Sequence, residues 1–141
     1  MRLTEQSRYA LRVLAHCGGQ HPALAKVATI AAVTGITEQN IFKLIKTLAK
    51  AGFVTTNRGP HGGVRLAKPP SAIRVGQVIR AIEPRFKACG PMGVMLSEQP
   101  VSAVERELDR TIGRGIAAFM ETLDRTSIAM LVAKTSAANA A

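Results

Sequence analysis

One stretch of this sequence, residues 34–69, restricts the fold more than any other because three local signals follow one another in it. Thr37 precedes a polar first turn and is a favourable N-cap, and Gly52 suits the left-handed residue that follows a helix. A helix is therefore predicted over residues 38–51. Its apolar residues recur at intervals of three or four and form one buried face, while the other side is basic. The buried face consists of Ile41, Leu44, Ile45 and Leu48.

A β-hairpin is predicted directly after this helix. Residues 53–56 and 64–67 have the β-branched and aromatic character of strands, and residues 57–63 between them hold three glycines and a proline. Upstream, residues 27–31 predict a short helix, joined to the next by a tight link that contains Gly35. Helix, turn, helix and hairpin in this order make a winged helix, in which the second helix enters the DNA major groove.

The distribution of charge favours a polyanionic partner. The net charge of the 141 residues is +10. Residues 1–70 contain ten lysines or arginines against two acids, a balance of +8, and residues 71–141 contain nine against seven, a balance of +2. Each phosphate that a basic side chain neutralises releases counterions and adds affinity. The alternative is a helical domain with a solvated lysine face, which the placement of Arg58, His61 and Arg65 in and beside the hairpin disfavours.

Composition and periodicity predict a mainly α fold with a small β-hairpin wing. Hydrophobic residues make up 47% of the chain and aromatic residues 4%, which favours aliphatic helix packing in a single domain. A first helix is predicted over residues 7–17, ended by Gly18 and Gly19, and a short connecting helix over residues 75–82. The segment from residue 84 to 100 is rich in glycine and proline and is predicted to be a sensor-like loop.

A long amphipathic helix is predicted over residues 101–123 and is suited to pack against its copy in a homodimer. The alternative is a helix that folds back on its own domain. We expect four regions: a winged helix-turn-helix over residues 1–83, the loop, a dimerisation helix region over residues 101–133, and a disordered tail over residues 134–141. The dimerisation face consists of Val104, Leu108, Ile112, Ile116 and Phe119, with Val101 and Leu123 at its ends.

Several other classes of protein are disfavoured by what the sequence lacks. No apolar run approaches the roughly 20 residues of a membrane span, and the N-terminus is unlike a signal peptide, so a cytoplasmic protein is expected. No catalytic constellation of histidine, cysteine and acid occurs, which argues against an enzyme. His16, Cys17 and His21 are badly placed to share a metal ion, and core packing of Cys17 is expected instead.

The sequence resembles the Rrf2 family of bacterial transcription regulators, and the RirA and NsrR branches most closely. The resemblance covers nearly the whole chain and rests on the segments MRLTEQSRYALRVL, IAAVTGITEQNIFKLIKTLAKAGFV, NRGPHGGVRLAKPP and IRVGQVIRAIE. It implies a homodimer that binds partly palindromic operator DNA. We expect this dimer to repress transcription by occupying promoter DNA. A winged helix used as a protein-interaction module is the alternative from another class.

The predicted site on DNA combines the second helix of the motif with the wing. The amide side chains of Gln39 and Asn40 suit adenine edges, and the basic residues suit phosphates and groove electrostatics. The resemblance places Thr37 to Lys43 at the start of the reading helix and Arg58 in the minor groove. The full set is Thr37, Gln39, Asn40, Lys43, Lys46, Lys50, Arg58, His61 and Arg65, with Lys68 as a further source of positive charge.

The cysteines depart from the family pattern. In the family that the sequence resembles, cluster-binding members hold an iron–sulfur centre with three cysteines in the loop before the long helix. This chain has Cys89 alone in that loop. No cofactor and no metal are therefore expected, although atypical cluster ligands remain an alternative. Three interpretations of the signal stay open: a thiol switch at Cys89, a bound small ligand, or no effector. The positive charges of Arg85 and Lys87 would favour the thiolate form of Cys89.

Overall fold

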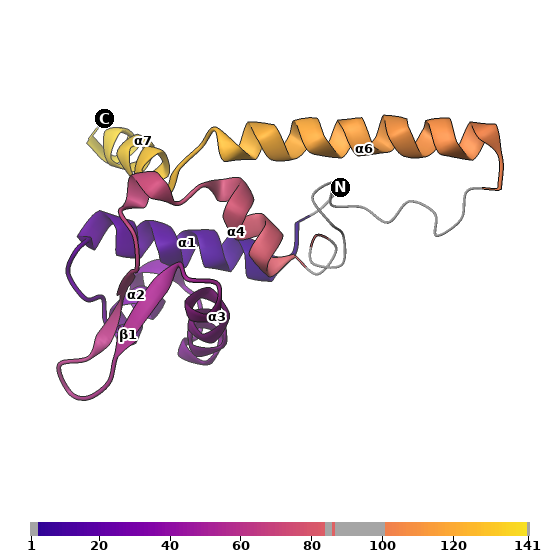
Figure 1. Ribbon diagram of the computed structural model, residues 1–141. Helices are drawn as coiled ribbons and strands as arrows, with labels where there is room; N and C mark the ends of the chain where they lie inside the picture. Colours follow the sequence, from indigo (N-terminus) through magenta and orange to yellow (C-terminus); the bar gives the residue numbers. More distant parts are fainter. Residues whose placement is uncertain (1–2, 84–85, 87–100, 141) are drawn as a thin grey trace.

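The protein is described by a computed structural model in which residues 3–83, 86 and 101–140 are placed. The chain forms a head of short helices with a projecting hairpin, and a long helix extends beyond the head (Figure 1). The elements are α1 (Glu5–Gln20), α2 (Val27–Thr34), α3 (Glu38–Lys50), β1 (Val54–Asn57), β2 (Gly63–Leu66), the 3-10 turn η1 (Pro70–Ala72), α4 (Val75–Ile82), α6 (Ala103–Asp124) and α7 (Ile128–Ala140).

The predicted helix-turn-helix is confirmed, and so is the mainly α fold class. Gly35 ends α2 in the left-handed conformation with φ 69°, and Gly52 follows α3 with φ 78°. The Thr37 side chain accepts a hydrogen bond from the Asn40 amide at 3.3 Å and caps α3. The buried residues of α3 are the predicted four, Ile41, Leu44, Ile45 and Leu48.

The wing is held to the head by a short backbone bridge that the sequence did not predict. Strands β1 and β2 pair antiparallel, from Val54 opposite Leu66 to Asn57 opposite Gly63. Ala25 exchanges two backbone hydrogen bonds with Val64, at 2.8 and 2.9 Å, so the segment before α2 joins the hairpin. A Cβ on Gly63 would lie 2.6 Å from the Ala25 carbonyl oxygen, so this close approach requires glycine.

Two predictions about helix ends, one at Gly18 and one in the C-terminal tail, were wrong. Helix α1 continues through Gly18 and Gly19 to Gln20. A Cβ on Gly18 would lie 2.9 Å from the Ile128 side chain, so this glycine permits α7 to approach α1 instead of ending α1. The tail predicted to be disordered from residue 134 is helical, since α7 continues to Ala140 in a segment rich in alanine, the best helix former.

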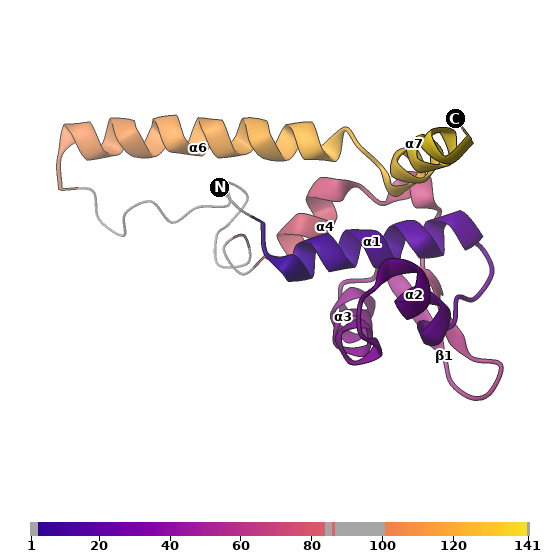
Figure 2. The ribbon, with the colours of Figure 1, turned by 180° about the vertical axis from the view of Figure 1, so that it is seen from behind.

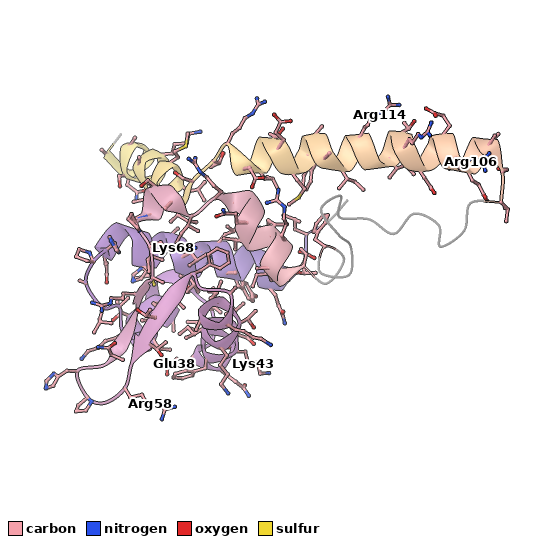
Figure 3. The ribbon with its side chains drawn as sticks, viewed as in Figure 1. Glu38, Lys43, Arg58, Lys68, Arg106 and Arg114 are labelled. Carbon is pink, nitrogen blue, oxygen red and sulfur yellow. The ribbon has the colours of Figure 1, made fainter. Side chains whose placement is uncertain are left out.

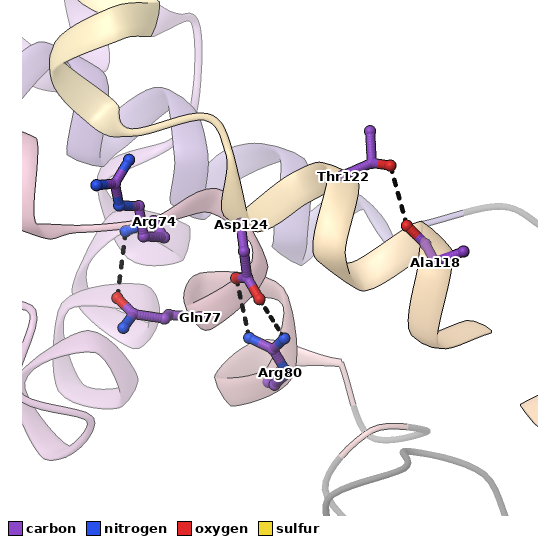
Figure 4. Close-up of polar contacts among 6 residues, drawn as sticks. All are labelled: Arg74, Gln77, Arg80, Ala118, Thr122 and Asp124. Atoms are coloured by element: carbon purple, nitrogen blue, oxygen red, sulfur yellow. Dashed lines mark hydrogen bonds and ion pairs between the residues drawn. The ribbon is translucent and has the colours of Figure 1, made fainter. Parts of the chain in front are cut away.

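Helix α6 is attached to the head by its C-terminal end. Arg80 of α4 binds Asp124 through two hydrogen bonds of 3.0 and 2.5 Å (Figure 4), and this contact raises the pKa of Arg80. A Cβ on Gly76 would lie 2.1 Å from the Asp124 carboxylate, so α4 presents glycine where α6 ends. Helices α6 and α7 lie on the opposite side of the head from α3 and the hairpin (Figures 1 and 2).

A buried carboxylate joins the two ends of the head. Glu83, at the end of α4, is 3% exposed. Its Oε1 accepts hydrogen bonds from the Thr4 amide at 2.7 Å, the Thr4 hydroxyl at 2.9 Å and the buried Ser7 hydroxyl at 2.7 Å. The carboxylate therefore fixes the N-terminus of α1 against the C-terminus of α4.

No helix in the placed part of the chain is long and apolar enough to cross a membrane.

Candidate nucleic-acid interface

The exposed face of α3 and the wing lie at one end of the head, away from α6. Figure 3 shows Glu38 and Lys43 on α3 at this end, with Arg58 beside them on the wing, while Arg106 and Arg114 lie on α6 at the other end. Lys68, which we expected to add positive charge here, lies farther from this end (Figure 3). We call the surface formed by α3 and the hairpin the basic face.

The exposed residues of α3 divide into a centre and two flanks. Successive residues of an α-helix are rotated by about 100°, so Gln39, Lys46 and Lys50 lie opposite the buried face, with Lys43 next to them. Asn40 lies on the flank toward α1, in a depression that Gln6, Tyr9, Lys43, Leu44 and Thr47 also line. Gln39 and Asn40 therefore point in different directions, so their side-chain amides cannot both bind the same base.

The wing presents its basic residues to solvent. Arg58 and His61 lie in the exposed turn between the strands, and Arg65 is exposed on β2 opposite Thr55. Glycine shapes this turn: Gly59 has φ 103°, and a Cβ on Gly62 would lie 2.3 Å from the Asn57 carbonyl oxygen. Glycine at these positions therefore permits the tight turn at the tip of the wing.

A groove of about 540 Å³ separates α3 from the wing. It includes two residues that we did not predict as part of the site, Lys26 at the N-cap of α2 and Phe42 on α3. A signal for Phe42 was present, because its position falls outside the Ile41 to Leu48 face of the helix. The groove is lined by Lys26, Phe42, Lys46, Arg58, Pro60 and Val64, among others.

The cations of the basic face are free of ion pairs within the placed residues, unlike three arginines on and directly after α6. Arg110 and Arg114 each lie 3.6 Å from Glu107, and Arg125 lies 3.1 Å from Glu121. No such pair within 4.0 Å involves the lysines of α3 or the arginines of the wing in the described part of the chain. The basic face therefore carries uncompensated positive charge, which attracts a polyanion.

The predicted dimerisation residues fall into two groups along α6. Ile116 and Phe119 are partly buried in a cluster with Met120 of the same helix and with Val75 and Ile79 of α4 in the head. The N-terminal half of the same stripe is uncovered: Val101 is 87% exposed, Val104 77%, Leu108 53% and Ile112 39%. Only the C-terminal half of the helix folds against its own head, and the side chains of the N-terminal half are left exposed.

The structure describes one of the two cysteines. Cys17 is fully buried in the core, as predicted, and burial raises the pKa of its thiol to about 11. Burial also lowers the pKa of the neighbouring His16. Cys89 lies outside the described residues. No group of three or more potential metal ligands occurs among the residues that are placed.

A capped helix with a basic outer face, set beside a glycine-shaped hairpin, defines a winged helix-turn-helix DNA-binding protein. The chain belongs to the Rrf2 family, whose model, described as an iron-dependent transcriptional regulator, matches residues 3–134. Because the family consists of transcriptional regulators, the prediction that this chain is not an enzyme is confirmed.

The chain is also similar to known proteins in sequence and in structure. Protein aau3 of Rhizobium meliloti (strain 1021) is 41% identical over 86 residues, which are 61% of this chain and 56% of that protein. The structure of CymR (YrzC), the global cysteine regulator of B. subtilis, superposes with a TM-score of 0.77 at 27% identity, covering 95% of this chain and 98% of that one. IscR of T. potens, at 23% identity and a TM-score of 0.70, shares the fold over 96% of this chain and 88% of its own.

Proposed function

We propose that this chain is a homodimeric repressor that occupies promoter DNA at a partly palindromic operator. The observation that carries the proposal is the uncompensated basic face, in which the central residues of α3 lie beside the arginines of the wing. Helix α3 would enter the major groove, and Arg58 would reach the adjacent minor groove or its phosphates. Repression follows if the operator overlaps the promoter, because bound protein then excludes the polymerase.

The uncovered half of α6 supports the homodimer. Its apolar side chains recur along one stripe from Val101 to Ile112, on a helix that projects beyond the head (Figure 1). Exposed apolar stripes of this length are costly in water, and a second copy of the same helix would cover them symmetrically. Because α6 lies away from the basic face, a dimer formed through it leaves both basic faces free for two half-sites.

The alternative is a winged helix that binds an acidic protein. The two functions differ in how their affinity responds to salt. For a protein that binds DNA phosphates, the logarithm of the affinity falls steeply and linearly with the logarithm of the salt concentration. Binding of a random 30-base-pair duplex, followed by fluorescence anisotropy between 50 and 300 mM salt, tests the proposal. A slope near zero would contradict DNA binding through the basic face.

Lys46→Ala and Gln39→Ala should separate phosphate binding from base reading. We expect Lys46→Ala to weaken binding to operator and random DNA alike and to reduce the salt slope by about one, because one phosphate contact is lost. Gln39→Ala should lower the preference for operator over random DNA and leave the slope unchanged. Equal effects of both changes on preference and on slope would show that the roles are assigned wrongly.

We also propose that the protein holds no three-cysteine iron–sulfur cluster. Cys17 lies in the core and Cys89 is the other of only two cysteines in the chain, so three thiolate ligands are not available. Protein isolated without oxygen should be colourless and should contain much less than one iron and one sulfide per chain, by metal analysis and visible absorption. Stoichiometric iron and sulfide would mean that other side chains serve as ligands.

Any response to oxidants should depend on Cys89. The thiol of Cys17 is buried with a pKa of about 11, so it remains protonated and protected from peroxide at neutral pH. We expect peroxide to change DNA binding of the wild-type protein and of Cys17→Ser, and to leave Cys89→Ser unaffected. An unchanged peroxide response in Cys89→Ser would eliminate the thiol switch.

A further inference from the structure

Phe42 is a large aromatic side chain that is half exposed on the surface of α3. Its exposed fraction is 52%, whereas Phe53 is 6% exposed in the core. The neighbouring positions on the buried face, Ile41 and Ile45, already fill the contact between α3 and the head. Single exposed apolar residues are common on protein surfaces, so a partner for Phe42 has to be inferred from the residues around it.

The surroundings of Phe42 indicate the chemistry of that partner. The side chain lines the groove between α3 and the wing, together with Lys46 one helical turn later and Arg58 across the groove. A protein partner with an apolar side chain would have to bring it between two cations. A DNA strand fits better, because its phosphates suit the cations while its bases offer apolar edges to the aromatic ring.

The major groove offers one apolar group, the C5-methyl of thymine. We infer that Phe42 determines part of the sequence specificity by packing against a thymine methyl on the strand that crosses the groove between α3 and the wing. Lys46 and Arg58 hold the phosphates of that strand, and Phe42 reads its base. This inference rests on the proposed DNA-binding function and adds an apolar contact to the polar ones from Gln39.

The test uses DNA sequences that are selected by their binding to the protein. The full-length wild-type chain selects duplexes from a random-sequence pool, and each thymine of the selected site is then replaced singly by uracil, which lacks only the methyl group. We expect one thymine position per half-site at which uracil lowers wild-type affinity about fourfold, the effect of one buried methyl group. Phe42→Ala should bind the thymine and uracil duplexes equally.

Val33→Ala is the matched control, since Val33 is an exposed apolar residue of α2, 67% accessible, on a surface with α1 and α7. This variant should keep the wild-type difference between thymine and uracil. Unchanged thermal midpoints of both variants would show that folding is preserved.

The outcomes distinguish this inference from the proposed function. If the wild-type protein selects no sequence and its binding ignores salt, both fail. If it selects a sequence but shows no uracil effect, or if Phe42→Ala keeps that effect, DNA binding stands and the role of Phe42 is overturned. A loss in Phe42→Ala that is equal for selected and random duplexes would also overturn it, because it would show packing on the sugar–phosphate backbone.

Discussion

Replacing Leu108 and Ile112 together with glutamate should convert a dimer into monomers. Both side chains lie in the uncovered half of α6, at 53% and 39% exposure. Burying each such side chain stabilises an interface by roughly 1.5–3 kcal/mol, and each change occurs twice in a symmetric dimer. The dimer dissociation constant should therefore rise by roughly a thousandfold or more. Analytical ultracentrifugation over a concentration series measures this change.

DNA binding by this double variant should weaken mainly for duplexes that contain two half-sites. A dimer holds two half-sites, and the second contact forms at high effective concentration, which typically increases affinity 10²–10⁴-fold. Loss of dimerisation should lower affinity for a two-half-site duplex by about that factor and leave affinity for a single half-site nearly unchanged. This difference separates loss of the dimer from damage to the basic face.

Ala103→Glu combined with Ala117→Glu provides the matched control. Both alanines are exposed on the side of α6 that lies away from the apolar stripe, and the change in charge is the same. This variant should remain dimeric. If the Leu108 and Ile112 variant also remained dimeric, the contact between protomers would have to lie elsewhere on the chain.

Glu83→Ala should lower the free energy of unfolding by about 2–4 kcal/mol. The change removes the Oε1 acceptor and leaves the buried Ser7 hydroxyl without its hydrogen bond to the carboxylate. A hydrogen bond to a charged group contributes about 1.5–3 kcal/mol, and a buried donor left unsatisfied costs a further penalty. Urea unfolding followed by circular dichroism measures the loss, at one protein concentration because dimerisation also affects stability.

Glu83→Gln is the conservative comparison. Its side chain keeps an oxygen at the position that receives the bonds from Thr4 and Ser7, so we expect a loss of only about 1 kcal/mol. Ser7→Ala, which removes one donor to Oε1, should fall between Glu83→Gln and Glu83→Ala. Equal stability of Glu83→Ala and the wild type would mean that the buried carboxylate does not hold α1 against α4.

Local sequence signals were sufficient for the helix-turn-helix, the wing and α4. The N-cap at Thr37, the left-handed glycines at residues 35 and 52, and the period of the apolar face in α3 all act within a few residues of one another. Helix α4 matches its prediction at both ends, Val75 and Ile82. The basic residues of α3 and the wing could be named for the same reason, since their exposure follows from the period of the buried residues.

Contacts between distant segments could not be read from such signals. The sequence by itself determined the helix-turn-helix, the wing and α4, which residues of α3 face the core, and where positive charge concentrates, because cap, period and turn chemistry are properties of short stretches. Only the tertiary structure decided that Gly18 lies within α1 against Ile128, that Glu83 binds residues 76 and 79 positions away, and that the apolar stripe of α6 is half covered. The physical reason is that each of these depends on which surfaces meet after folding, and no local pattern specifies the partner.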